Sequence, residues 1–116
     1  MKRGTIVLTP FPFTDLSSKK VRPAVIVSSD KRNDTDLIIA FISSVFDLNN
    51  FHETSIILDS NDSYFPETGL KMTSIIRVDK LATVEKKIIL GELGSLDNKL
   101  ISLLNSKLKI VLGIDN

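Results

Sequence analysis

The sequence contains no cysteine, no tryptophan and a single histidine, His52, among its 116 residues. Without cysteine the chain can form neither a disulfide framework, nor a thiolate nucleophile, nor a cysteine-ligated zinc site. One histidine excludes every mechanism or metal site that needs two imidazoles from one chain. The sequence also lacks a glycine-rich phosphate-binding loop, a dinucleotide fingerprint and a paired-carboxylate motif. We therefore expect no resident metal ion and no cofactor.

Long apolar runs and a strong net charge are also missing. The opening MKRGTIVLTPFPF is interrupted by Thr9, Pro10 and Pro12, which does not fit a signal peptide. No stretch approaches the roughly 18 consecutive apolar residues of a membrane span, so we expect a cytoplasmic protein that does not enter a membrane. The formal net charge is only +1, so any basic binding face must come from uneven placement of lysine and arginine.

What is present indicates one mainly β domain over residues 1–116, closed by a helix. Short apolar runs predict strands, separated by turn-rich segments, at residues 5–9, 24–29, 36–45, 54–59 and 74–84. From Asp97 onward the apolar residues recur every three or four positions up to Gly113, which is the spacing of one helix face. Asp97 is a suitable N-cap, and glycine commonly follows a helix end. The predicted architecture is a small β-barrel with a C-terminal helix.

Arg22 stands directly before Pro23 at the start of an apolar run. Proline restricts the preceding residue to extended conformations and lacks an N–H, so it belongs at a strand start or an edge. A guanidinium held there could grip phosphate oxygens through two parallel hydrogen bonds. It could equally be a surface arginine that pairs with an acid.

Two further pairs of polar residues interrupt apolar strands. Ser43 and Ser44 must point to opposite faces, and either hydroxyl could contact a phosphate or simply bond to backbone. Arg77 and Asp79 share one face, as in a surface ion pair or in an acid–base pair beside a ribose.

The loops hold the remaining candidates. Residues 10–20 combine Phe11 and Phe13 with Lys19 and Lys20, and this composition suits stacking on unpaired bases and attraction of their phosphates. The phenylalanines could instead pack on the core. His52 lies in a polar loop, where it could act in acid–base chemistry or remain solvated.

The stretch KRGTIVLTPFPFTDLSSKKVRPAVIVSSD resembles the PemK/MazF family of toxin endoribonucleases. The resemblance continues through LIIAFISS, TGLKMTSIIRVDKLATV and LDNKLISLLNSKL, so it covers nearly the whole chain. It implies an SH3-like barrel with a C-terminal helix, shared with toxins of the CcdB type, and a homodimer. It also implies metal-independent cleavage of single-stranded RNA and a cognate antitoxin partner, with which such toxins form DNA-binding complexes.

The resemblance also implies which residues form the site. The arginine of the Arg-Pro pair and a hydroxyl residue near the end of the third strand recur in the family, and they match Arg22 and Ser43, with Ser44 as the fallback. Some members rely on an arginine and an aspartate that match Arg77 and Asp79. The loop after the first strand contacts RNA in such enzymes, which makes its members substrate-binding candidates: Phe11, Phe13, Ser17, Lys19 and Lys20.

The sequence departs from the family pattern at several places. Thr5 replaces a common aspartate, a serine replaces the commoner threonine, and the loop FPFTDLSSKK differs from the usual type and has no histidine. Two other functions stay open: a toxin on the same fold that binds a protein such as DNA gyrase, and an inactive relative that only dimerises.

Overall fold

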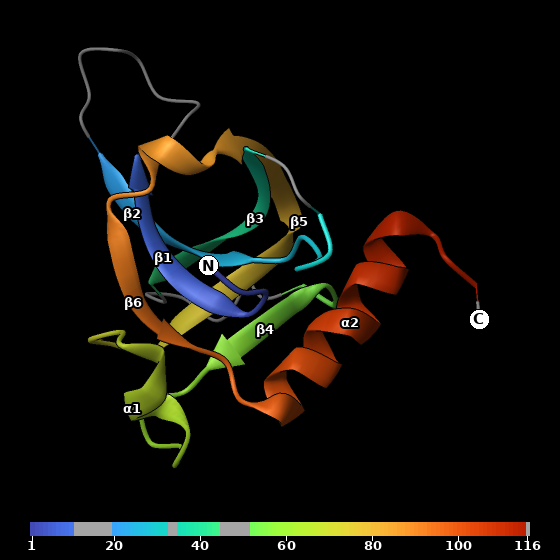
Figure 1. Ribbon diagram of the computed structural model, residues 1–116. Helices are drawn as coiled ribbons and strands as arrows, with labels where there is room; N and C mark the ends of the chain where they lie inside the picture. The colour runs from blue at the N-terminus through green and yellow to red at the C-terminus, as the bar shows by residue number, and fades with distance from the viewer. Residues whose placement is uncertain (11–19, 33–34, 45–51, 116) are drawn as a thin grey trace.

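The structure is a computed structural model that describes residues 1–10, 20–32, 35–44 and 52–115 (Figure 1). Its strands are β1 (Thr5–Pro10), β2 (Val21–Ile26), β3 (Asp36–Ser44), β4 (Ser55–Leu58), β5 (Ser74–Glu85) and β6 (Gly91–Ser95). Its helices are α1 (Phe65–Thr68), the 3-10 turn η2 (Lys86–Ile88) and α2 (Asn98–Leu112). The mainly β fold with a C-terminal helix is therefore confirmed.

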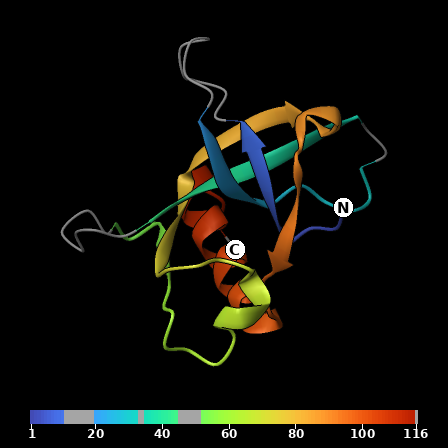
Figure 2. The same ribbon diagram turned by 90° about the vertical axis from the view of Figure 1, so that its left-hand side faces the viewer.

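The six strands form one antiparallel sheet in the order β4-β5-β3-β2-β1-β6. Figure 1 shows that this sheet curls strongly around its own axis, and Figure 2 shows β1 and β2 side by side. The ladders described join neighbours in that order and none joins the edge strands β4 and β6, so in the described residues the sheet is a half-barrel.

The β2 strand begins earlier than predicted, at Val21 rather than residue 24, and it lies inside the sheet between β3 and β1. The backbone carbonyl of Ile26 accepts from Gly4 on the β1 side, whereas the N–H of Val27 donates to Ile38 on the β3 side. By alternation, the backbone of Pro23 faces β3. Proline has no N–H to donate there, and the β2–β3 ladder indeed ends at the next pair, Ala24–Phe41.

The sheet buries apolar residues on both faces. The larger cluster lies between the sheet and α2 and includes Ile6, Val25, Ile76 and Leu104. The second cluster occupies the opposite face and includes Val7, Ala24, Ile26, Ile39 and Phe41. Both faces of β2 and β3 are covered, which explains their continuous apolar sequence.

Helix α2 matches its prediction closely. The Asp97 side chain caps it by accepting from the N–H of Leu100 at 2.9 Å. Gly113 ends it with a positive φ of 68°. Leu100 and Leu104 are buried against β4 and β5. Among the described residues, no helix has the length and apolar character needed to cross a membrane.

Three elements were not predicted: β6, α1 and the 3-10 turn η2. The sequence of β6, GELGS, has one apolar residue and two glycines, so it carries no strand pattern. Its backbone nevertheless pairs with β1. A Cβ added to Gly94 would lie 2.1 Å from the carbonyl oxygen of Glu67, so the close approach of β6 to α1 requires glycine at this position.

Candidate active site

One face of the sheet carries a row of residues that crosses four strands. Directly paired residues in antiparallel strands share a face. Ala24 of β2 pairs with Phe41 of β3, which pairs with Arg77 of β5, which pairs with Ser55 of β4. Arg77 is therefore on the face of the second apolar cluster, away from α2.

Arg22 is on the same face, one row further along. It pairs with Thr9 of β1, two residues before Ala24 on its own strand. Continuing the β2–β3 register by two residues would set Ser43 opposite Arg22. The β2–β3 ladder ends before that pair, at Ala24–Phe41. Arg22 and Ser43 thus lie just beyond the last paired residues of the two strands.

Ser44 is on the other face. It pairs with Ser74, whereas Ser43 pairs with Ile75, which belongs to the face of Arg77. The register therefore distinguishes the two serines: Ser43 shares a face with Arg22, Arg77 and Asp79, and Ser44 does not.

Arg22 is half-buried, and the Nε atom of its guanidinium is buried. Its partner Thr9 is 0% exposed, and the Thr9 hydroxyl donates to the carbonyl of Pro10 at 3.3 Å. Thr9 was not singled out in the sequence, because nothing local marks the last residues of β1 as neighbours of Arg22.

Arg77 and Asp79 form a two-pronged ion pair. The Nε of Arg77 donates to Oδ1 of Asp79 at 3.0 Å, and Nη2 donates to Oδ2 at 2.9 Å. The side chains are 22% and 37% exposed. The hydrogen bonds from Arg77 lower the pKa of Asp79 below its usual range, and the charge of His52 adds to this effect. The same bonds raise the pKa of Arg77. Asp79 is thus held ionised.

A β-bulge sets the position of this pair. The β3–β5 register jumps between Ala40, which faces Leu81, and Phe41, which faces Arg77. Residues 78–80 fall inside the jump and have no partner in β3. Bulges re-aim side chains next to active sites, and this bulge lets Asp79 turn back to Arg77.

The loop candidates receive less support. Phe11, Phe13, Ser17 and Lys19 lie outside the described residues. Lys20 is described and is exposed just before β2, two residues from Arg22. His52, for which the sequence leaves open an acid–base role or a solvated loop, precedes β4, and its charge is one of the causes that lower the pKa of Asp79.

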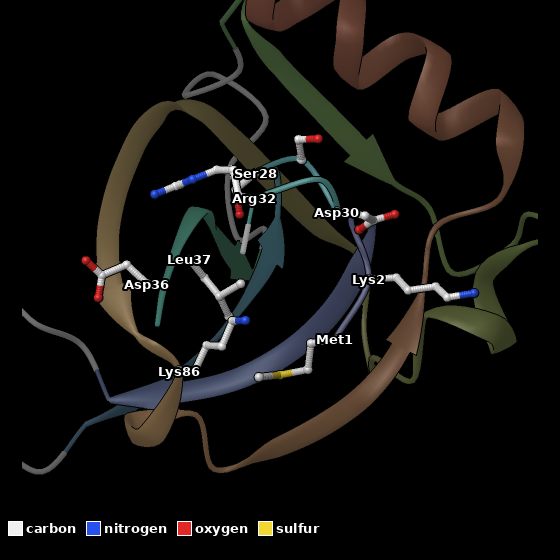
Figure 3. A pocket seen from close by; sticks show the side chains of 9 residues that line it. Met1, Lys2, Ser28, Asp30, Arg32, Asp36, Leu37 and Lys86 are labelled. Atoms are coloured by element: carbon white, nitrogen blue, oxygen red, sulfur yellow. The ribbon is translucent and has the colours of Figure 1, made fainter. Parts of the chain in front are cut away.

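A separate pocket of about 340 Å³ lies at the other end of β3 (Figure 3). Its lining includes Lys2, Asp30, Arg32, Asp36, Leu37 and Lys86. Asp30 accepts a 2.6 Å hydrogen bond from the backbone N–H of Arg3. The pocket mixes charges of both signs and contains none of the candidate site residues.

Comparison with known proteins gives three kinds of result. A family model described as "PemK-like, MazF-like toxin of type II toxin-antitoxin system" matches residues 2–112. No curated protein matches the chain by sequence. Among solved structures, the chain is similar to an endoribonuclease in complex with its cognate antitoxin from a mycobacterial species, with a TM-score of 0.76, 18% identity and coverage of 100% of this chain and 98% of that chain.

Two other solved structures give a similar result. The toxin MazF-mt6 of Mycobacterium tuberculosis aligns with a TM-score of 0.72 and 16% identity over 97% of this chain and 99% of that one. MazF from Deinococcus radiodurans aligns with a TM-score of 0.74 and 15% identity over 98% and 97%. At these identities the likeness shows a common fold. Because the family model spans nearly the whole sequence, the chain belongs to the PemK-like, MazF-like toxin family of type II toxin–antitoxin systems.

Proposed function

We propose that this member of the PemK-like, MazF-like toxin family is an endoribonuclease that cleaves single-stranded RNA in the cytoplasm without a metal ion. The proposal rests on one observation: the same face of the sheet bears Arg22, Ser43, Arg77 and Asp79. These residues come from three different strands. Their common face supports a shared task better than separate surface roles.

The proposed reaction uses the RNA's own nucleophile. The 2′-oxygen forms a bond to the adjacent phosphorus, and the bond from phosphorus to the 5′-oxygen breaks. One proton leaves the 2′-hydroxyl and one proton reaches the 5′-oxygen. The products are a 2′,3′-cyclic phosphate and a 5′-hydroxyl. A chain without cysteine is suited to this chemistry, because the protein supplies only charge stabilisation and proton transfer.

Arg22 and Ser43 would contact the reacting phosphate. A guanidinium keeps its charge at all working pH values and can donate two parallel hydrogen bonds to phosphate oxygens. Ser43, on the same face just beyond the last β2–β3 pair, would donate its hydroxyl to an oxygen that gains negative charge. Preorganised donors of this kind each contribute about 10²–10³-fold to a rate.

Asp79 would accept the proton of the 2′-hydroxyl. An arginine cannot do so, because its pKa exceeds about 12. Arg77 keeps Asp79 ionised and retains further N–H donors for a neighbouring phosphate, since only two of its five are used in the pair. Lys19, Lys20 and Ser17 would contact flanking phosphates, and Phe11 or Phe13 would stack on a base.

The test is cleavage of a mixed single-stranded RNA by purified protein in the presence of a chelator. Wild type should produce defined fragments, and Arg22→Ala should lose about 10²–10³-fold in rate. Arg32→Ala is the matched control, because Arg32 lies at the pocket at the other end of β3. Identical fragments at identical rates from wild type and Arg22→Ala would contradict the assignment.

An alternative function, a toxin that binds a protein such as DNA gyrase, draws support from α2. This helix exposes Leu103, Ile110 and Leu112, in addition to the leucines that it buries. In a growth-arrest assay, Leu103→Ser with Ile110→Ser would abolish toxicity under this alternative, whereas Arg22→Ala would not. The nuclease proposal expects the reverse.

We further propose a homodimer and a cognate antitoxin as partners. One mycobacterial structure with this fold is described as an endoribonuclease in complex with its cognate antitoxin, and another structure with this fold is described as MazE-MazF from Deinococcus radiodurans. An acidic, disordered antitoxin segment that folds across the Arg22 face would compete with RNA.

A further inference from the structure

His52 is tied by its backbone to the strand beside Arg77. Its carbonyl accepts from the N–H of Ser55 at 2.9 Å, and its own N–H donates to the Ser55 hydroxyl at 3.4 Å. Ser55 is 1% exposed and pairs directly with Arg77. The single histidine of the sequence is therefore held on the turn before β4, the strand that pairs with β5 at Arg77.

The imidazole of His52 is exposed, so a bound RNA strand can reach it. The charged groups around it come from three elements. Asp79 and Arg77 belong to β5, Glu53 follows on the same turn, and Lys107 of α2 donates to the carbonyl of Glu53. The contact from Lys107 fixes the turn against the helix. Lys80 follows Asp79 on β5 and is exposed.

The Arg77 hydrogen bonds lower the pKa of the Asp79 carboxyl, and the charge of His52 adds a smaller effect in the same direction. A carboxylate that stays ionised can accept a proton, and an imidazole can donate one.

We propose that His52 is the general acid of the site, which protonates the 5′-oxygen as it leaves. This role rests on the proposed nuclease function. As the 2′-oxygen attacks phosphorus, its proton passes to Asp79, and the imidazolium N–H proton passes to the departing 5′-oxygen. The products are the cyclic phosphate, the 5′-hydroxyl, protonated Asp79 and neutral His52. Exchange of one proton between these two groups, directly or through solvent, restores the starting state.

We assign His52 as the acid rather than the base because of Arg77 and Asp79. Asp79 is the group that Arg77 keeps ionised, so the site already has a proton acceptor. What the four sequence candidates lack is a donor that gives up a proton readily, because guanidinium and serine hydroxyl groups do so only at high pH. Imidazole is the side chain that changes charge between pH 5 and 8.

The first experiment compares single-turnover cleavage by wild type and His52→Gln from pH 5 to 8. The variant should lose about 10²–10⁴-fold in rate at neutral pH. In wild type the cleavage rate should fall as pH rises, because a general acid loses its proton. His52→Gln should not show this fall. Affinity for an RNA with a 2′-deoxy cleavage site should not change. Glu53→Gln is the matched control on the same turn and should behave as wild type.

A substrate with sulfur in place of the 5′-bridging oxygen isolates the proposed step. A thiolate leaves without protonation, so His52→Gln should cleave this substrate at nearly the wild-type rate. An equal deficit on the oxygen and sulfur substrates would overturn the role of His52 as acid.

A second readout needs no activity. Carboxyl-carbon NMR of Asp79 should show a higher pKa in His52→Gln than in wild type, because the neighbouring positive charge is lost. An unchanged pKa would overturn the proximity on which the role depends. If wild type cleaves no RNA at all, the proposed function fails together with the role. If wild type cleaves and His52→Gln cleaves equally, only the role of His52 fails.

Discussion

Two ion pairs along β5 have the same spacing in sequence. Arg77 and Asp79 form the first pair within the strand, and Glu85 at its end forms the second pair with Lys87. The side chains of Arg77 and Asp79 are 22% and 37% exposed and are joined by two hydrogen bonds. Lys87 and Glu85 are 80% and 57% exposed and joined by one contact of 3.1 Å. An exposed pair contributes about 0–1 kcal/mol and is screened by salt. A spacing of two residues therefore does not distinguish the two pairs, whereas their exposure, the two-pronged geometry and the β-bulge do.

The largest difference between the two pairs should appear in catalysis. Asp79→Asn removes the proposed proton acceptor and should reduce single-turnover cleavage of RNA by about 10²–10⁴-fold. Glu85→Gln makes the same chemical change in the other pair and should leave the rate unchanged. Equal rates for Asp79→Asn and wild type would show that the pair near the bulge is only structural.

The second prediction extends the comparison to the two serines of β3. Ser43→Ala should reduce cleavage by about 10²–10³-fold, because Ser43 shares the face of Arg22. Ser44→Ala, one residue further on the opposite face, should have little effect on the rate. A larger loss for Ser44→Ala would mean that Ser44, and not Ser43, contacts the reacting phosphate.

The third prediction concerns stability. A double-mutant cycle by urea unfolding with Arg77→Ala and Asp79→Ala should give a coupling energy of up to about 1 kcal/mol. The same cycle with Lys87→Ala and Glu85→Ala should give about zero. Raising the salt concentration should reduce the first value only in part, since its groups are less exposed.

The smallest effect is the pH dependence of that coupling. Arg77 lowers the pKa of Asp79 in the folded protein, so ionised Asp79 contributes stability above the carboxyl's unfolded pKa of about 3.9. The contribution is lost as pH falls through the lower, folded pKa. The difference in the free energy of unfolding between wild type and Asp79→Asn should therefore shrink as the pH falls below about 4. A decrease already at pH 6 would assign the effect to another group.

Much of the fold could be read from periodicity. Helix α2 has a capping aspartate, a terminal glycine and leucines at helical spacing, and these local signals agree. Strand β6 could not be found in this way, because GELGS gains its conformation from pairing with β1 and from close contact at Gly94. Local sequence carries no record of such partners.

The site was predictable only where alternation along a strand suffices. Arg77 and Asp79 were placed on one face correctly, since they are on the same strand. The choice between Ser43 and Ser44 required the register between strands, and His52 required the turn that ties it to Ser55. Contacts between distant segments are set by tertiary pairing, which no single stretch of sequence encodes.

On the face that bears Arg22 and Asp79, we propose that the 2′-hydroxyl of the RNA itself attacks the adjacent phosphate. The most direct measurement is to map the cut sites on a long single-stranded RNA in chelator and to identify the new ends. This reaction predicts that wild type, but not Arg22→Ala, produces fragments that carry a 2′,3′-cyclic phosphate and a 5′-hydroxyl. Fragments with 5′-phosphates, or no fragments at any protein concentration, would contradict it.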